Sequence, residues 1–130
     1  MPQTSDSPAV KLARAHVEAW SNQDFDTARD GLAAEITVTT SSTNPEIPAT
    51  ELVGVEDYMR GLVLFAQPIV PGSVRVTDSV GDDRYALLMV TVRVDGPPYG
   101  KLTIHNARLY RFDDNDKLAA ERVIFYTVPD

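Results

Sequence analysis

The stretch that decides the fold is KLTIHNARLYRF, residues 101–112, together with the returning run at residues 117–128. Both runs alternate along the chain and are rich in β-branched and aromatic side chains, which is typical of strands. The four residues between them, DDND, favour a turn. The pattern therefore predicts an antiparallel hairpin near the C-terminus.

The length of the hairpin loop decides which side chains face one another. A loop of two or four residues places Phe112 opposite Lys117, and counting back then places Arg108 opposite Glu121. A three-residue loop would set Arg108 against Arg122, and two like charges directly opposite each other are unfavourable. The charges therefore favour the register that pairs Arg108 with Glu121.

The two faces of this hairpin differ in polarity. One carries Asn106, Arg108 and Glu121 within an apolar surround, and the other carries His105 among mostly apolar side chains. Because neither is plainly a solvent face, we expect both to be covered.

Upstream of the hairpin, helices come first and most strands follow. Helical spacing of apolar residues predicts helices at 8–20, 25–31 and 55–66, opened by Asp6 or Ser7, by Asp24 and by Gly54. Strands are expected at 35–41, 73–80 and 84–95, a surface loop with two prolines at 43–52, and a rigid loop at 96–100. This order is typical of an α+β fold with helices on one face of an antiparallel sheet. The length predicts a single domain, residues 9–130, after a flexible N-terminus, residues 1–8.

Composition excludes several classes of function. The formal net charge is -7, with 19 acidic and 12 basic residues, and the basic residues are scattered, so we expect neither nucleic acid nor a membrane as a partner. Cysteine is absent, and the two histidines, His16 and His105, do not have metal-ligand spacing. We therefore expect no cofactor or metal. Because the first eight residues lack an apolar core and no run of 18 uncharged apolar residues occurs, we expect a cytoplasmic protein. The three aspartates of DDND lack the glycine and the distal glutamate of a calcium loop, so they are interpreted as turn formers.

Three segments together resemble a known family. They are HVEAWSNQDFDTARDGLAAEITV, the glycine at Gly54 and ARLYRFDDNDKLAAERV. Their order and spacing, from about Val10 to Val128, resemble the nuclear transport factor 2-like superfamily, especially its SnoaL-like and ketosteroid-isomerase-like branch. The resemblance implies a cystatin-like cone, in which a curved antiparallel sheet wraps around N-terminal helices. It also implies a pocket at the open end and a homodimer formed through the outer sheet face, where His105 would lie.

That superfamily includes isomerases, epoxide hydrolases, dehydratases, cyclases and binding modules, so the residues must decide. Its steroid isomerases use a tyrosine, an aspartate base and a protonated acid, where this sequence has His16, Thr40 and Arg108. Members similar to limonene epoxide hydrolase place an arginine between two carboxylates. Arg108 and Glu121 resemble half of that set, and Asn106 stands in the neighbourhood of the second carboxylate.

Four residues are candidate catalytic groups. Glu121 would act as general base or acid, Arg108 would orient a carbonyl or oxyanion, and Asn106 would orient a water or substrate oxygen. His16 would shuttle protons near neutral pH. Each has a structural alternative. Arg108 and Glu121 could form an exposed salt bridge at the sheet rim, Asn106 could be a hydrogen-bonded core amide, and His16 could be a structural histidine at a helix edge. The candidates for lining the pocket, with simple core packing as their alternative, are Trp20, Tyr58, Leu62, Phe65, Val90, Val92, Tyr110, Val123 and Phe125.

Two functions remain open at this point. The first is a cofactor-independent enzyme, a hydrolase, isomerase, dehydratase or cyclase, acting on an apolar oxygenated small molecule. The second is a non-catalytic module of the same fold for ligand binding or dimerisation. Polar groups on an apolar inward face are costly unless they are used, which favours the enzyme.

Overall fold

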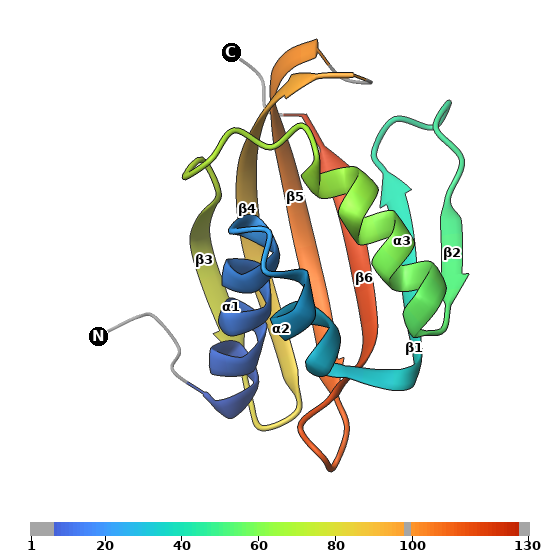
Figure 1. Ribbon diagram of the computed structural model, residues 1–130, viewed down its shortest axis with the longest axis vertical. Helices are drawn as coiled ribbons and strands as arrows, with labels where there is room; N and C mark the ends of the chain where they lie inside the picture. The colour runs from blue at the N-terminus through green and yellow to red at the C-terminus, as the bar shows by residue number, and fades with distance from the viewer. Residues whose placement is uncertain (1–6, 98–99, 128–130) are drawn as a thin grey trace.

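The structure is a computed structural model that describes residues 7–97 and 100–127 (Figure 1). These residues form three helices and six strands. In chain order they are α1 (Pro8–Ser21), α2 (Phe25–Asp30), β1 (Leu32–Ser42), β2 (Thr50–Val53), α3 (Val55–Ala66), β3 (Arg75–Gly81), β4 (Tyr85–Gly96), β5 (Gly100–Phe112) and β6 (Leu118–Tyr126). The expected loose N-terminus falls mostly on residues 1–6, which lie outside the described residues.

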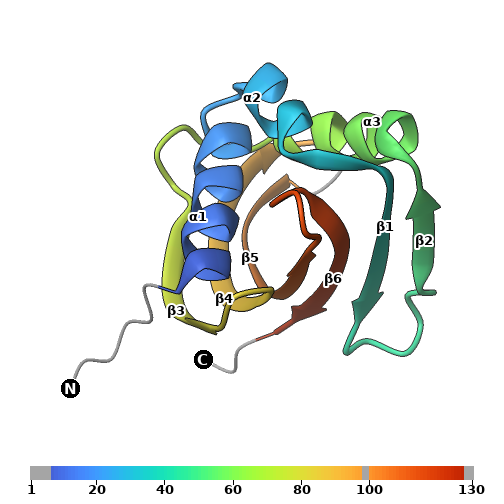
Figure 2. The same cartoon turned by 90° about the horizontal axis from the view of Figure 1, so that it is seen from below.

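The six strands form one sheet in the order β2-β1-β6-β5-β4-β3. All three helices lie on the same side of it (Figure 1), and the view from below shows the sheet curling toward them without closing (Figure 2). The expected α+β fold with a curved sheet is confirmed. The sheet is mostly antiparallel, as expected, and the one exception is the pair β1 and β6, which run parallel. No short turn joins these two strands, so nothing local in the sequence indicates their direction.

The helices begin and end where the sequence indicates. Ser7 caps α1, since its Oγ accepts a hydrogen bond from the Val10 amide at 3.3 Å, and Asp24 caps α2 in the same way. Gly54 precedes α3 with φ 92° and ψ 155°, a conformation that only glycine adopts readily. No helix within the described residues is long and apolar enough to cross a bilayer.

The expected surface loop at residues 43–52 is shorter than predicted. Thr50–Val53 form β2, which pairs with β1 so that Thr50 lies beside Thr40. The two prolines, Pro45 and Pro48, precede this segment, so its amides are free to pair at the sheet edge. The other expected loop joins β4 to β5, which remain paired up to Gly96 and Gly100, and residues 98–99 lie outside the described residues.

The predicted register of the β5–β6 hairpin is wrong by two residues. Arg108 lies opposite Val123, and Glu121 lies opposite Tyr110. Two single-residue shifts produce this difference. The loop leaves Phe112 opposite Leu118, which is an odd loop length, and a bulge before the next pair adds a second residue.

The two shifts together preserve the side of the sheet on which each residue lies, because strand side chains alternate with a period of two. Arg108 and Glu121 therefore still share the inner face, as the sequence indicates, although they are diagonal neighbours. Arg108 also avoids Arg122. The aspartates of the loop form the turn: Asp113 Oδ1 accepts hydrogen bonds from the amides of Asn115 and Lys117, at 2.9 and 3.0 Å.

The inner face of the sheet and the helices enclose the core. On the outer face of the single chain, Leu87, Leu109 and Ile124 are 37–44% exposed. They lie close together, since Leu87 pairs with Leu109 across β4 and β5, and Ile124 lies on the neighbouring β6. We expected both faces of the sheet to be covered. In the single chain the helices cover the inner face, and the outer face remains exposed.

Candidate active site

The centre of the site is the side chain of Arg108 on β5. Its Nη1 donates to Glu121 Oε2 at 2.7 Å, and its Nε donates to Asn106 Oδ1 at 2.7 Å. The side chains of Arg108 and Glu121 are only 5% and 1% exposed. This excludes the exposed rim salt bridge that the sequence left open.

Two aromatic rings lie close to the guanidinium of Arg108, and they also contact each other edge-on, with their centroids 5.7 Å apart. The Trp20 ring centroid lies 5.0 Å from Cζ, and the Phe65 centroid lies 5.3 Å from it. Arginine is suited to such a position because its flat, weakly hydrated group stacks on aromatic faces. The rings and the carboxylate together offset part of the cost of burying the charge.

Tyr58 on α3 extends the network toward the first helix. Its hydroxyl donates to Glu121 Oε1, and His16 Nε2 lies 2.9 Å from the same hydroxyl oxygen. The hydroxyl has one proton, and a carboxylate held by Arg108 only accepts. The bond between His16 and Tyr58 must therefore be donated by the imidazole, which assigns the His16 proton to Nε2.

Burial sets the protonation states around the ion pair. It raises the pKa of Tyr58 and of Tyr110 well above the usual tyrosine value, and the nearby charge of Glu121 raises both further. It also lowers the pKa of His16, with Glu121 opposing this effect and Arg108 adding to it. At neutral pH, the site thus consists of one buried ion pair, protonated phenols and a neutral imidazole.

A cavity of about 220 Å³ opens beside this network, between α3 and the strands β1, β5 and β6. Arg108, Glu121 and Tyr58 form its polar wall. The predicted lining residues that contribute apolar wall are Leu62, Phe65, Val123 and Phe125. An ion pair in the wall of a largely apolar cavity is the arrangement expected of a small-molecule site.

The remaining predicted residues lie in the core or behind the wall. Trp20, Val90, Val92 and Tyr110 are completely buried and pack in the core, where Trp20 supports Arg108 from behind. His16 contacts the cavity only through Tyr58. The four predicted catalytic residues are thus joined in one hydrogen-bonded chain, His16–Tyr58–Glu121–Arg108–Asn106.

Sequence reasoning missed the part that Tyr58 plays. It was predicted only as a lining residue, yet its hydroxyl connects His16 to Glu121. The helical stripe of α3 indicates that Tyr58 faces inward, but its partner lies 63 positions away along the chain. No local sequence pattern predicts that contact.

Three buried polar atoms close to this network have no hydrogen-bond partner among the described residues. They are Trp20 Nε1, Asn106 Nδ2 and Tyr110 Oη. All three atoms can donate, and none of their residues lines the cavity. The described residues include no cluster of three or more metal-ligating side chains. The charged groups that line the cavity leave two kinds of chemistry open, proton transfer by Glu121 and hydrogen bonding from Arg108 to a ligand oxygen.

With this geometry established, comparison with known proteins identifies the family. The SnoaL-like domain family matches residues 13–121, and the chain belongs to this family, within the nuclear transport factor 2-like superfamily. No curated protein sequence matches the chain.

Solved structures share the fold. A protein from Kribbella flavida DSM 17836 is 24% identical, with a TM-score of 0.75 over 91% of this chain and 86% of that one. A protein named as a SnoaL-like polyketide cyclase from Shewanella denitrificans OS-217 is 13% identical, with a TM-score of 0.70 over 90% and 89%. An M. tuberculosis epoxide hydrolase similar to limonene epoxide hydrolase is 17% identical, with a TM-score of 0.69 over 91% and 82%. At these identities the likeness shows the fold alone.

Proposed function

We propose that this protein is a cofactor-independent enzyme that acts by general acid/base chemistry on an apolar, oxygenated small molecule bound in the cavity. The observation that carries the proposal is the position of Glu121. The side chain of Glu121 is only 1% exposed, it is held by Arg108, and the residue forms part of the cavity wall. A buried ion pair of this kind seldom increases stability over an apolar replacement, and its placement at a cavity suits a functional role.

Each group has a definite task in this proposal. Glu121 takes a proton from a substrate carbon or from a water molecule and later returns it. Arg108 orients the substrate carbonyl and stabilises the negative charge that develops on its oxygen. Tyr58 stays protonated and holds Oε1 of Glu121, and His16 fixes Tyr58 in turn. Hydrolases, isomerases, dehydratases and cyclases all need a proton transfer of this kind.

A binding module without catalysis is the second candidate, and one observation favours it. Each oxygen of Glu121 already accepts a hydrogen bond within the protein, one from Tyr58 and one from Arg108. In the epoxide-hydrolase arrangement, the neighbourhood of the second carboxylate is where this sequence has Asn106, which cannot act as an acid. In that case, the same cavity would bind its ligand and release it unchanged.

We also propose a cytoplasmic homodimer whose contact is the outer sheet face. The exposed side chains of Leu87, Leu109 and Ile124 give that face an apolar centre. Burying them against a second copy would remove apolar surface from water, which is the main source of stability in dimer interfaces.

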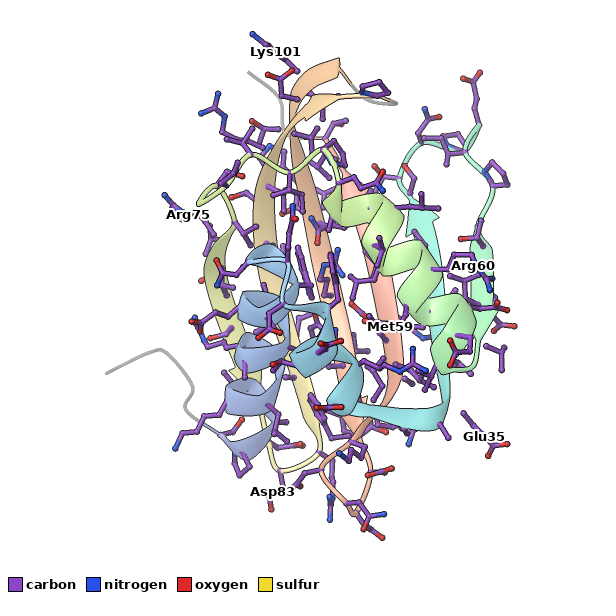
Figure 3. The ribbon with its side chains drawn as sticks, in the orientation of Figure 1. Glu35, Met59, Arg60, Arg75, Asp83 and Lys101 are labelled. Atoms are coloured by element: carbon purple, nitrogen blue, oxygen red, sulfur yellow. The ribbon has the colours of Figure 1, made fainter. Side chains whose placement is uncertain are left out.

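A thermal-shift screen tests the proposed function. Wild type, Glu121→Gln and the control Glu35→Gln would be screened against lipophilic epoxides, enones, sterols and polyketide-like phenols, and each hit assayed for turnover. Glu35 is exposed and lies at the edge of the molecule in Figure 3, so its loss should change nothing. A ligand at a hundred times its dissociation constant adds roughly 2.7 kcal/mol to the stability.

The proposal expects ligands that wild type and Glu35→Gln convert and that Glu121→Gln does not. Ligands that stabilise all three proteins alike and are never converted would favour the binding module. If no compound stabilises wild type while Glu121→Gln is as stable as wild type, the ion pair has no part in ligand binding.

A further inference from the structure

A second, larger hollow adjoins the cavity. It is a groove of about 880 Å³ at the end of the sheet where Figure 3 labels Lys101, between the β1–β2 connection and the strands β5 and β6. Thr40 and Phe125 line both the cavity and the groove. The two hollows are therefore neighbours that share a wall.

The volumes indicate how a ligand would use them. Sites that bury a drug-sized molecule occupy about 300–1,000 Å³. The cavity beside Glu121, at about 220 Å³, is too small for this and has room only for one reacting end of a larger ligand. The groove falls within that range, so the rest of the ligand can be bound there.

The lining of the groove indicates the chemistry of that second part. Among the described residues, seven of the lining side chains are serine or threonine, from Thr40 on β1 to Thr127 after β6. The apolar surface comes from residues such as Ile47, Leu102 and Phe125. No aspartate, glutamate, lysine or arginine is present among the described lining residues. The imidazole of His105 is the one basic side chain among these described lining residues, so a charged ligand group would find little counter-charge there, whereas ligand hydroxyl groups would find hydrogen-bond partners.

We propose that the substrate is an uncharged, two-part molecule, with an oxygenated ring that enters the cavity and a hydroxyl-rich part, such as a neutral sugar, that lies in the groove. This inference rests on the proposed function, because it assigns the reacting end to the cavity of Glu121. It adds that affinity is determined largely in the groove, by groups outside the catalytic network.

Three coumarin probes with a common ring test the proposal by isothermal titration calorimetry. They are 7-methoxy-4-methylcoumarin, 4-methylumbelliferyl β-glucoside and the corresponding β-glucuronide. The glucuronide differs from the glucoside only by a carboxylate in place of a hydroxymethyl group. We expect wild type to bind the glucoside at least tenfold more tightly than the methoxy compound and to lose most of that gain with the glucuronide.

Matched variants locate the gain. Thr50→Val and Thr103→Val remove the hydroxyl groups of two residues that line the groove, and both residues are exposed, so the fold should tolerate the change. Each is expected to weaken glucoside binding by about 3- to 10-fold, the range of one hydrogen bond. Neither should alter binding of the methoxy compound. Thr39→Val, on the same strand as Thr40 but outside the groove lining, should bind both compounds as wild type does.

The failures can be told apart. If wild type binds the glucoside and the methoxy compound equally, the groove has no part in recognition and this inference is overturned, while the proposed function stands. The same holds if the glucuronide binds as tightly as the glucoside, or if Thr39→Val loses as much affinity as the groove variants. If wild type binds none of the three probes, the cavity does not take oxygenated rings, and the proposed function fails together with the inference.

Discussion

The bridging hydroxyl of Tyr58 offers the sharpest test of the network. Tyr58→Phe keeps the ring and removes only the oxygen that accepts from His16 and donates to Glu121. A hydrogen bond to a charged group contributes about 1.5–3 kcal/mol, and a buried donor left without a partner costs about 1–3 kcal/mol. Since the mutation also removes a desolvated hydroxyl, we expect a net loss of roughly 2–4 kcal/mol in the free energy of unfolding.

Urea denaturation measures this loss directly, and the melting temperature should fall by about 8–16 °C for a chain of this length. Tyr85→Phe is the matched control, because Tyr85 is 48% exposed and its substitution should change stability by less than about 0.5 kcal/mol. The double mutant with His16→Leu should cost about 1 kcal/mol less than the sum of the single mutants, because His16 acts through Tyr58. A Tyr58→Phe variant as stable as Tyr85→Phe, or strictly additive costs, would refute the reasoning.

Three further predictions concern charge and association. Burial lowers the pKa of His16, so below about pH 6.5 the unfolded chain binds more protons. As the pH falls from 7.5 to 5.5, the free energy of unfolding of wild type, measured in urea, should therefore fall relative to that of His16→Gln, by up to about 1.4 kcal/mol per pH unit. The same pH dependence in both proteins would contradict this. Arg108→Lys keeps the charge but loses the contacts of the flat guanidinium with the rings of Trp20 and Phe65, and should cost about 2–4 kcal/mol in the same assay, whereas a neutral result would count against these contacts. Leu109→Glu should convert a dimer to a monomer in sedimentation, and a monomeric wild type at micromolar concentration would remove the dimer proposal.

Local signals were sufficient for most of the fold. The helix starts at Ser7, Asp24 and Gly54 were predictable, because a capping residue or a glycine affects the backbone of its immediate neighbours in the chain. The strand β2 was missed because the predicted loop was extended to Leu52. The two prolines prevent regular structure only before Thr50, where β2 begins. The parallel pairing of β1 with β6 could not be predicted, since it joins strands far apart in the sequence.

The sequence predicted on which face of the sheet the site lies, but not which residues contact one another there. Alternation along β5 and β6 placed Arg108 and Glu121 on one face whatever even shift the register took. The register itself depended on an odd loop and a bulge, whose two single-residue shifts add to a shift of two and leave no separate signal in the sequence. The contacts of Trp20 and Tyr58 with the ion pair come from helices packed across the sheet, and only the folded chain brings them together.

The most direct test of the central claim compares turnover and binding in one variant. On a compound that wild type converts, Glu121→Gln should lower kcat by about 10²- to 10⁴-fold, the usual contribution of a general acid or base. The dissociation constant should change far less, since the amide preserves the shape of the cavity wall. A Glu121→Gln variant that converts the compound at the wild-type rate would contradict the claim that Glu121 transfers the proton.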